Sequence, residues 1–177
     1  MLQIKGNQIK RADKKMLRRF SQYVLDKYVT ASTQAEATII VKFIHADSLK
    51  TPKERREFRE CRAWSEYDGR RNGKRHFTVE IATNTISKRT KVQIKKLKEA
   101  MECLGHELIH VKQYLNNEMF DYANGNVRWK GKIIKDWQEG EAYYFSPFEI
   151  EAYGHEVGLY KCFREKLKKE KQDRTRT

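Results

Sequence analysis

The expected fold is decided by the sequence H-E-L-I-H at residues 106–110, which lies inside a longer helical run spanning about 91–116. Residues four apart lie on one face of a helix, so His106 and His110 can offer two imidazole nitrogens to one metal ion. Glu107 lies beside them, where a carboxylate can accept a proton from a metal-bound water. The pattern therefore predicts half of a zinc site together with its general base.

The helical run around this pattern is amphipathic. Its apolar side chains recur every three or four residues, at Leu97, Met101, Leu104, Leu108, Val111 and Leu115. This spacing predicts a stripe that packs on a core. At about 100° per residue, His106 and His110 fall on the opposite side of the helix. We expect a sheet against the stripe and a second element over the histidines; the alternative is two exposed histidines on an ordinary surface helix.

Length and composition describe a polar, single-domain protein. The chain has 177 residues, of which 38% are hydrophobic and 35% charged, and its mean hydropathy is −0.90. It holds no apolar run near 18 residues, and its first residues lack the apolar core of a secretory signal. Three widely spaced cysteines predict no disulfide framework. We therefore expect a cytoplasmic location and no membrane partner.

A net charge of +14 makes a nucleic-acid partner possible. Residues 50–75 hold ten basic and five acidic side chains, and residues 161–177 hold eight basic and three acidic ones. Both stretches mix the two signs, as solvated helix surfaces also do, and no nucleic-acid-binding motif accompanies them. The charge alone does not decide between these two interpretations.

The remaining elements can be placed from local patterns. In chain order, the sequence predicts a helix at 13–29, a central strand at 38–44, a helix from Thr51-Pro52 to about Cys61, turns at 68–69 and 72–73, an edge strand at 75–81 and a small hairpin across 127–134. Residues 137–144 carry no assignable pattern. The mixture of strands and helices predicts an α+β fold.

A last helix is expected to begin at residues 146–149, Ser-Pro-Phe-Glu, because a capping serine, a proline at the first helical position and a glutamate at the third form a capping box. This helix should run to about Lys169. The basic residues 170–177 are then expected to form a disordered tail, which leaves 1–169 as the single domain.

The last helix offers the third metal ligand. Glu149 has a local role in the capping box, whereas Glu151 has none, and Ala152 beside it would allow a close helix approach. We therefore favour Glu151 as the ligand. Glu149 is the alternative, and Glu156 and Glu141 are more distant ones. Two histidines and a carboxylate leave the fourth zinc position open for water, which is the catalytic rather than the structural arrangement.

Three segments of the chain together resemble a known family. Residues 106–113, 128–131 and 146–153 look like the small single-domain zincin metallopeptidases of the gluzincin type, which include the SprT-like and minigluzincin proteins of phages and bacteria. The resemblance covers roughly residues 38–160. It implies a zincin-like fold in which a short mixed sheet packs on the H-E-x-x-H helix and a C-terminal helix carries the third ligand.

The same resemblance implies the roles of individual residues. It makes His106, His110 and Glu151 the ligands of Zn²⁺ and Glu107 the general base of a metallopeptidase acting on a protein or peptide. The implied reaction is peptide-bond hydrolysis, in which Glu107 takes a proton from a zinc-activated water.

The developing oxyanion also needs a second donor. His155 ranks first for this role because it lies one turn after Glu151; Tyr153 and Tyr144 follow. His155 also departs from thermolysin-like enzymes, which carry an acidic residue four positions after the ligand glutamate. Residues 77–81, as an edge strand, would align the substrate backbone by strand addition.

Two other functions compete with this one. The chain could be a basic nucleic-acid-associated protein with a structural zinc, or a SprT-like protease that acts on DNA-bound proteins. It could also be an inactive zincin fold used as a binding module. The presence of Glu107 argues against an inactive fold, because a scaffold has no need for the general base.

Overall fold

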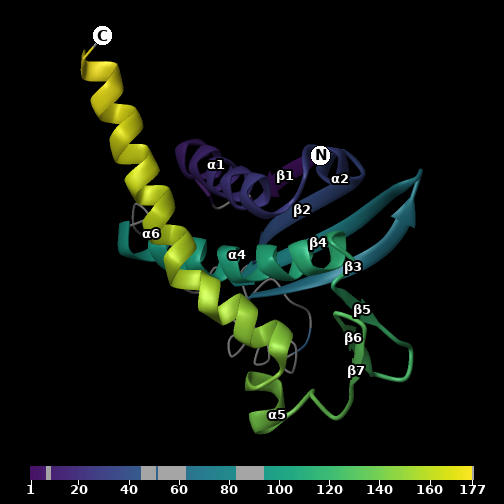
Figure 1. Cartoon of the computed structure of the whole chain (residues 1–177). Coiled ribbons are helices and arrows are strands. Elements are labelled where there is room, and N and C mark those ends of the chain that lie inside the picture. Colours follow the sequence, from purple (N-terminus) through teal and green to yellow (C-terminus); the bar gives the residue numbers. More distant parts are fainter. Residues whose placement is uncertain (7–8, 45–50, 52–62, 83–93, 177) are drawn as a thin grey trace.

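A computed structural model describes residues 1–6, 9–44, 51, 63–82 and 94–176 of the chain, and these residues form an α+β fold (Figure 1). In chain order the elements are β1 (Leu2–Lys5), α1 (Arg11–Tyr28), α2 (Ala31–Ala35), β2 (Ala37–Ile44), β3 (Ala63–Arg71), β4 (Lys74–Ala82), α4 (Ile94–Leu115), β5 (Met119–Asp121), β6 (Val127–Trp129), β7 (Lys132–Ile134), α5 (Gly140–Tyr144) and α6 (Pro147–Arg176). The helix expected between Thr51 and Cys61 lies outside the described residues.

The larger sheet is mixed, with the strand order β1-β2-β4-β3. Strand β2 pairs in parallel with β1 and β4, and β3 pairs with β4 in antiparallel fashion. The predicted central strand is therefore confirmed as the interior strand β2. Strand β4, predicted as an edge, is also interior.

Two charged residues led to the wrong prediction for β4, and both have partners in the fold. Glu80 accepts a hydrogen bond from Lys42 on the neighbouring strand at 3.0 Å. Arg75 donates to the Tyr114 carbonyl at the end of α4 at 3.1 Å and to the Asn117 side chain at 3.3 Å. A cation at this place interacts favourably with the carbonyl end of a helix. Paired in this way, charged side chains are compatible with an interior strand.

Strand β3 forms the edge of the sheet among the described residues, although the sequence pointed to turns in this stretch. Asn72 and Gly73, with φ of 51° and 74°, do form the two-residue turn that joins β3 to β4. Gly69, with φ of 85°, instead lies in a bulge within β3, where the register shifts between Tyr67 and Arg70. A turn signal in the sequence therefore corresponds to an irregularity inside a strand.

Helix α4 packs its apolar stripe into the main core, as predicted. The stripe side chains from Met101 to Leu115 are buried together with residues of α1 and the large sheet, and the buried members of the stripe are Met101, Leu104, Leu108, Val111 and Leu115. Burial of one such side chain contributes about 1.5–3 kcal/mol relative to exposure. Helix α6 crosses the other side of α4, so α4 is covered on two faces (Figure 1).

The smaller sheet, β5-β6-β7, fixes the chain that leads into α6. The predicted hairpin corresponds to β6 and β7, which are joined by Lys130 and Gly131 at φ of 45° and 87°. Trp129 of this sheet packs against Phe148 in the first turn of α6, in a second core cluster. This contact positions the start of α6 over α4.

Helix α6 begins at Pro147 as predicted, but the expected capping box is absent. The Ser146 hydroxyl donates to the Tyr143 carbonyl at 2.8 Å, and the Glu149 carboxylate points toward the histidines of α4. The helix also continues to Arg176 instead of ending near Lys169, so residues 170–176 are helical. None of the helices in the described part of the chain is long and apolar enough to cross a membrane.

Candidate metal centre

Two histidines of α4 face α6 side by side. His106 and His110 lie one helical turn apart, each is 8% exposed, and their Nε2 atoms are 3.2 Å apart. The predicted placement of both imidazoles on one face, opposite the apolar stripe, is therefore confirmed. Helix α6 covers this face, which rules out the exposed surface helix considered as an alternative.

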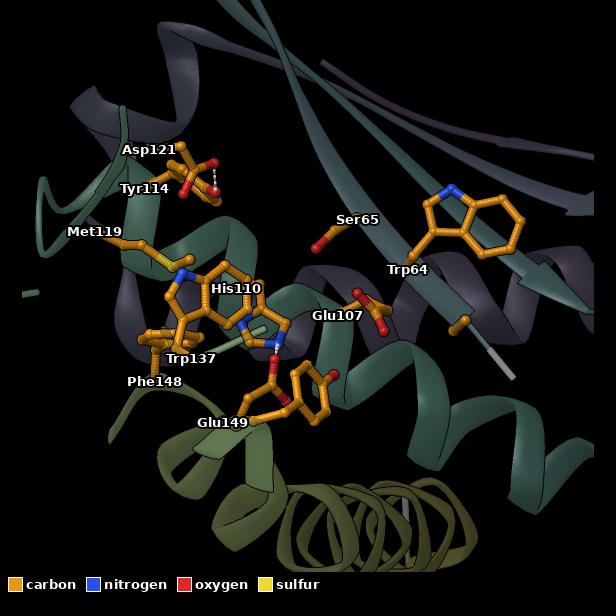
Figure 2. Close-up of a pocket in the computed structure, with 12 residues that line it drawn as sticks. Trp64, Ser65, Glu107, His110, Tyr114, Met119, Asp121, Trp137, Phe148 and Glu149 are labelled. Carbon is orange, nitrogen blue, oxygen red and sulfur yellow. Dashed lines mark hydrogen bonds and ion pairs between the residues drawn. The ribbon is translucent and has the colours of Figure 1, made fainter. Parts of the chain in front are cut away.

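Glu149 of α6 completes the group. Its carboxylate oxygens lie 3.2 Å from His106 Nε2 and 3.3 Å from His110 Nε2, and the residue is only 4% exposed. Figure 2 shows the carboxylate pointing at the His110 ring. Donor atoms of these three side chains all lie within 4.8 Å of one another, so this buried cluster could hold a metal ion.

The geometry of the cluster fits a small divalent cation. Ligand bonds of about 2.0–2.1 Å in a tetrahedral site place neighbouring donor atoms about 3.3–3.4 Å apart. The two histidine nitrogens are 3.2 Å apart, and they contact different oxygens of Glu149, Oε2 at 3.2 Å and Oε1 at 3.3 Å; each distance lies close to that value. In addition, Glu149 Oε2 is buried without a hydrogen-bond partner among the described residues. A cation between the three side chains would satisfy it.

The charges in the metal-free cluster also favour a cation at this place. Burial raises the pKa of Glu149, but the neighbouring His106 and His110 outweigh it and lower the pKa to about 2. Burial lowers the pKa of His110, but the hydrogen bond with Glu149 and the nearby carboxylates outweigh it and raise the pKa. The buried carboxylate thus requires positive charge beside it, which protons or a metal ion can supply.

Glu107 lies next to the cluster, as expected for a general base. It is almost completely buried, it lines the pocket together with Ser65 of β3, and burial raises its pKa in spite of the neighbouring histidines. Figure 2 shows Glu107 and Ser65 facing each other across the gap between α4 and the edge of the sheet. A carboxylate with a raised pKa is better suited to accept a proton near neutral pH.

The cluster opens into a pocket of about 300 Å³. Its walls come from β3, α4, the small sheet and the start of α6, and it is lined by Ala63, Trp64, Ser65, Glu107, His110, Tyr114, Met119, Asp121, Trp137, Tyr143, Phe148 and Glu149. Most of this lining is aromatic or apolar; Glu107, His110 and Glu149 lie at one end, and Asp121 lies apart from them beside Tyr114 (Figure 2). Such a combination is typical of ligand sites.

The structure does not place Glu151, the favoured third ligand, in the cluster. Its carboxylate accepts hydrogen bonds from Lys112 at 3.0 Å and from Gln113 at 2.9 Å. Two residues along a helix correspond to a rotation of about 200°, so Glu149 and Glu151 face different partners. The prediction misplaced the ligand because it assigned Glu149 to a cap that does not form.

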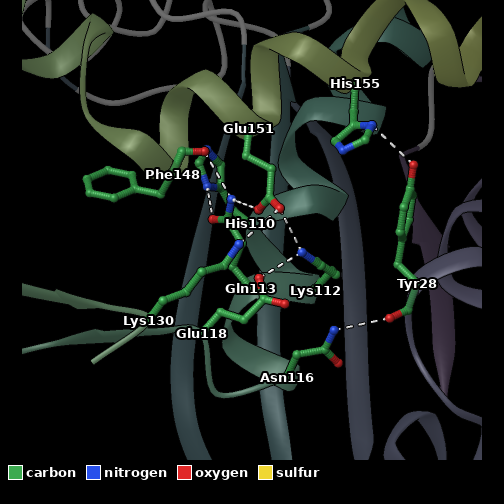
Figure 3. A network of polar contacts seen from close by, with 10 residues as sticks. All are labelled: Tyr28, His110, Lys112, Gln113, Asn116, Glu118, Lys130, Phe148, Glu151 and His155. Carbon is green, nitrogen blue, oxygen red and sulfur yellow. Dashed lines mark hydrogen bonds and ion pairs between the residues drawn. The ribbon is translucent and has the colours of Figure 1, made fainter. Parts of the chain in front are cut away.

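The three residues predicted as oxyanion donors, His155, Tyr153 and Tyr144, lie in different places relative to the cluster. His155 Nδ1 lies 3.1 Å from the Tyr28 hydroxyl, and the two side chains face each other away from the cluster (Figure 3). Its partner on α1 therefore turns it away from the pocket. Tyr153 does contact the site, since its ring centroid is 4.5 Å from that of His106. Tyr144 is 61% exposed.

Tyr143 is the pocket residue that the sequence did not identify. It lines the pocket beside Glu149, and both burial and the charge of Glu149 raise its pKa. The phenol therefore stays protonated and can donate a hydrogen bond at neutral pH. The sequence offered only a Tyr143-Tyr144 pair in an unassigned segment, with nothing to show which of the two faces inward.

The more distant ligand candidates stay outside the cluster. Glu156 Oε2 lies 3.8 Å from His106 Nδ1, on the side of the ring that faces away from the other donors, and Glu141 is exposed. Comparisons with protein-family models, with curated proteins and with solved structures gave no match to this chain. The interpretation of the site therefore depends on its own geometry.

Proposed function

We propose that this protein is a zinc-dependent metallopeptidase with His106, His110 and Glu149 as ligands and Glu107 as general base. The observation that carries the proposal is the position of a buried glutamate beside a two-histidine, one-carboxylate cluster that opens into a pocket. Two imidazoles and one carboxylate are a ligand set of catalytic zinc sites, which keep a fourth position for water or substrate. The sequence resemblance to the zincins supports His106 and His110 as ligands and Glu107 as base, although it implied Glu151 as the third ligand.

Zinc, when bound, supplies a Lewis acid that polarises a carbonyl group and acidifies water. The chain's own residues supply the proton transfer. Glu107, which lines the pocket together with Ser65, accepts a proton from the attacking water and delivers it to the leaving amine. Tyr143 is the best-placed hydrogen-bond donor for the substrate carbonyl oxygen, because its phenol lies in the pocket and stays protonated.

Strand β3 is the strand of the large sheet that lies beside the pocket. The sequence assigned the alignment of an extended peptide to residues 77–81, but that stretch lies in β4, whose two edges are both paired. Three residues of β3, Ala63, Trp64 and Ser65, line the pocket together with Glu107, so a bound peptide would contact this strand.

The test is hydrolysis of a proteome-derived peptide mixture by the zinc-loaded protein, read by mass spectrometry. We expect cleavage at defined sites that stops on chelation and falls by about 10²–10⁴-fold in Glu107→Gln. Glu99→Gln, on the same helix but outside the pocket, should cleave like the wild type. Equal cleavage by Glu107→Gln and the wild type would rule out this mechanism.

A second candidate function, association with nucleic acid, is favoured by one observation. Residues 11–20 of α1 hold five basic and one acidic side chain, and residues 161–176 of α6 hold eight basic and three acidic ones. The two segments meet where Phe163 packs on Phe20 and where Arg19 pairs with Glu170. Beyond this contact α6 extends past α1 (Figure 1). Much positive charge therefore gathers at one end of the molecule.

Phosphodiester backbones are the partners that such a surface fits, and their binding falls steeply with salt. A labelled duplex should bind at 50 mM salt and dissociate at 200 mM. Replacing Lys168, Lys169 and Lys171 by glutamine should weaken binding, whereas the control pair Lys132→Gln and Lys135→Gln on the small sheet should not. Equal loss in both variants, or no binding at low salt, would exclude this candidate.

A further inference from the structure

Gln113 is a fully buried side chain of α4 that lies between the metal cluster and α6. Its Nε2 donates to the Phe148 carbonyl at 3.0 Å and to Glu151 Oε2 at 2.9 Å. Both partners can only accept hydrogen bonds, so the amide NH₂ must face them. The amide oxygen is then left facing His110 Nδ1 at 2.9 Å. The amide therefore has one orientation.

This orientation decides which nitrogen of His110 carries the proton. An amide oxygen can only accept, so His110 Nδ1 must carry the hydrogen and donate it. In the neutral imidazole, the lone pair of Nε2 then lies on the side of the ring that faces His106 and Glu149, where a metal ion can replace the proton. A metal ligand needs this tautomer, and the hydrogen bond at the other ring nitrogen also fixes the plane of the ring.

Glu151 is held in turn by two lysines from different parts of the fold. Lys112 of α4 donates to Glu151 Oε1 at 3.0 Å and to Glu118 at 2.7 Å, and Lys130, in the β6–β7 turn, lies 3.6 Å from the same Glu151 oxygen. Figure 3 shows the chain of contacts from the lysines through Glu151 and Gln113 to His110. The carboxylate that orients Gln113 is therefore itself fixed from both sides.

We propose that Gln113 and Glu151 are positioning residues of the metal centre: Gln113 holds His110 in the tautomer that binds metal, and Glu151 holds Gln113. Glu151 thus contributes to metal binding without touching the ion. The inference depends on the metal cluster of the proposed function but not on peptide hydrolysis.

The first experiment measures zinc affinity by competition with a chelating dye. Gln113→Leu keeps the size of the side chain but removes the acceptor for His110 Nδ1, and we expect it to weaken zinc binding by about 10–100-fold. Gln172→Leu makes the same chemical change on the exposed part of α6 and should leave the affinity unchanged. Thermal unfolding of each zinc-free variant shows whether the fold is kept.

A reciprocal exchange separates positioning from a general loss of packing. Gln113→Glu retains an acceptor for His110 but places two carboxylates about as close as the present 2.9 Å contact, so affinity should fall. Adding Glu151→Gln restores a donor opposite the new carboxylate and keeps the net charge. The double variant should recover part of the affinity that Gln113→Glu loses, because only the Phe148 carbonyl still lacks its donor.

A spectroscopic signature provides a second readout. In the zinc-loaded wild type, His110 should show a slowly exchanging Nδ1 proton by ¹H–¹⁵N NMR, and Gln113→Leu should lose it. Wild-type zinc affinity in Gln113→Leu, or a double variant no better than Gln113→Glu, would overturn the inference. If these results hold while no peptide is cleaved, only the proposed peptidase activity fails.

Discussion

Two carboxylates on α6, separated by one residue, have different surroundings. Glu149 is almost fully buried and faces His106 and His110, which lower its pKa to about 2. Glu151 is half-buried and faces Lys112 and Gln113; burial raises its pKa, but these two partners outweigh the effect and lower it. Glu149 thus lies beside imidazoles, which can lose their protons, whereas Glu151 lies beside a lysine that stays charged.

This difference in surroundings suits the two glutamates of α6 to two roles, binding a metal ion and holding the residues around it. A carboxylate paired with a lysine is already neutralised, and a metal ion would have to displace that lysine. A carboxylate beside imidazoles has partners that lose their protons readily, so a metal ion can replace the protons. Glu149 therefore belongs to the reactive part of the molecule and Glu151 to the framework that holds it.

The largest effect on activity should come from Glu107, the proposed general base beside Glu149. Glu107→Gln should lower kcat/KM by about 10²–10⁴-fold while zinc content stays at the wild-type level. Because burial raises the pKa of Glu107, its ionised form destabilises the fold above pH 4.5, and the neutral glutamine should raise the midpoint of urea unfolding at pH 7. A lower midpoint would contradict the account of Glu107.

The next effect should come from the phenol beside Glu149. Tyr143→Phe removes the donor proposed for the substrate carbonyl oxygen and should lower kcat by about 10²–10³-fold, with a smaller change in KM. Tyr144→Phe, the same change at the exposed neighbour, serves as the control. Steady-state kinetics on a cleaved peptide measure both. An equal loss in the two variants would remove the reason for choosing Tyr143.

A smaller effect should appear in the pH dependence of the metal-free protein. The raised pKa of His110 stabilises the fold below pH 6.5, and this contribution is lost as the pH rises through the folded value. The lowered pKa of Glu149 stabilises the fold above pH 4.5, and this contribution is lost as the pH falls toward about 2. Both contributions are present between pH 4.5 and 6.5.

Urea unfolding with a chelator present tests this window. The free energy of unfolding should fall between pH 6 and pH 9 in the wild type, and Glu149→Gln should flatten that slope because it removes the partner of His110. Zinc should restore stability at high pH, where it no longer competes with protons. The same slope in wild type and variant would show that the pair is not coupled.

The smallest effect on stability and zinc affinity should come from Lys130, the more exposed of the two lysines that contact Glu151. Lys130 is half-exposed and lies 3.6 Å from the Glu151 carboxylate, so Lys130→Ala should cost less than about 1 kcal/mol of unfolding free energy. Zinc affinity should change by less than threefold or so, since Lys112 still holds Glu151. A large loss of zinc affinity would mean that Glu151 depends on both lysines.

The sequence predicted the parts of this structure that depend on local patterns. The apolar stripe identified α4, the H-E-x-x-H pattern placed two histidines and Glu107 on it, and β-branched residues identified β2. Two predictions were wrong because the same local signal is compatible with two structures. Gly69 was predicted in a turn but lies in a bulge of β3, and Glu149 was assigned to a capping box but faces the histidines. Only the packing of α6 on α4 shows which carboxylate meets the histidines.

The central claim is that Glu149, not Glu151, completes the metal site, and zinc content per chain tests it most directly. Elemental analysis after dialysis should find about one zinc in the wild type. We predict that Glu149→Ala loses this zinc, whereas Glu151→Ala retains it at saturating metal with an affinity lowered about 10–100-fold. Full zinc in Glu149→Ala together with none in Glu151→Ala would contradict the assignment.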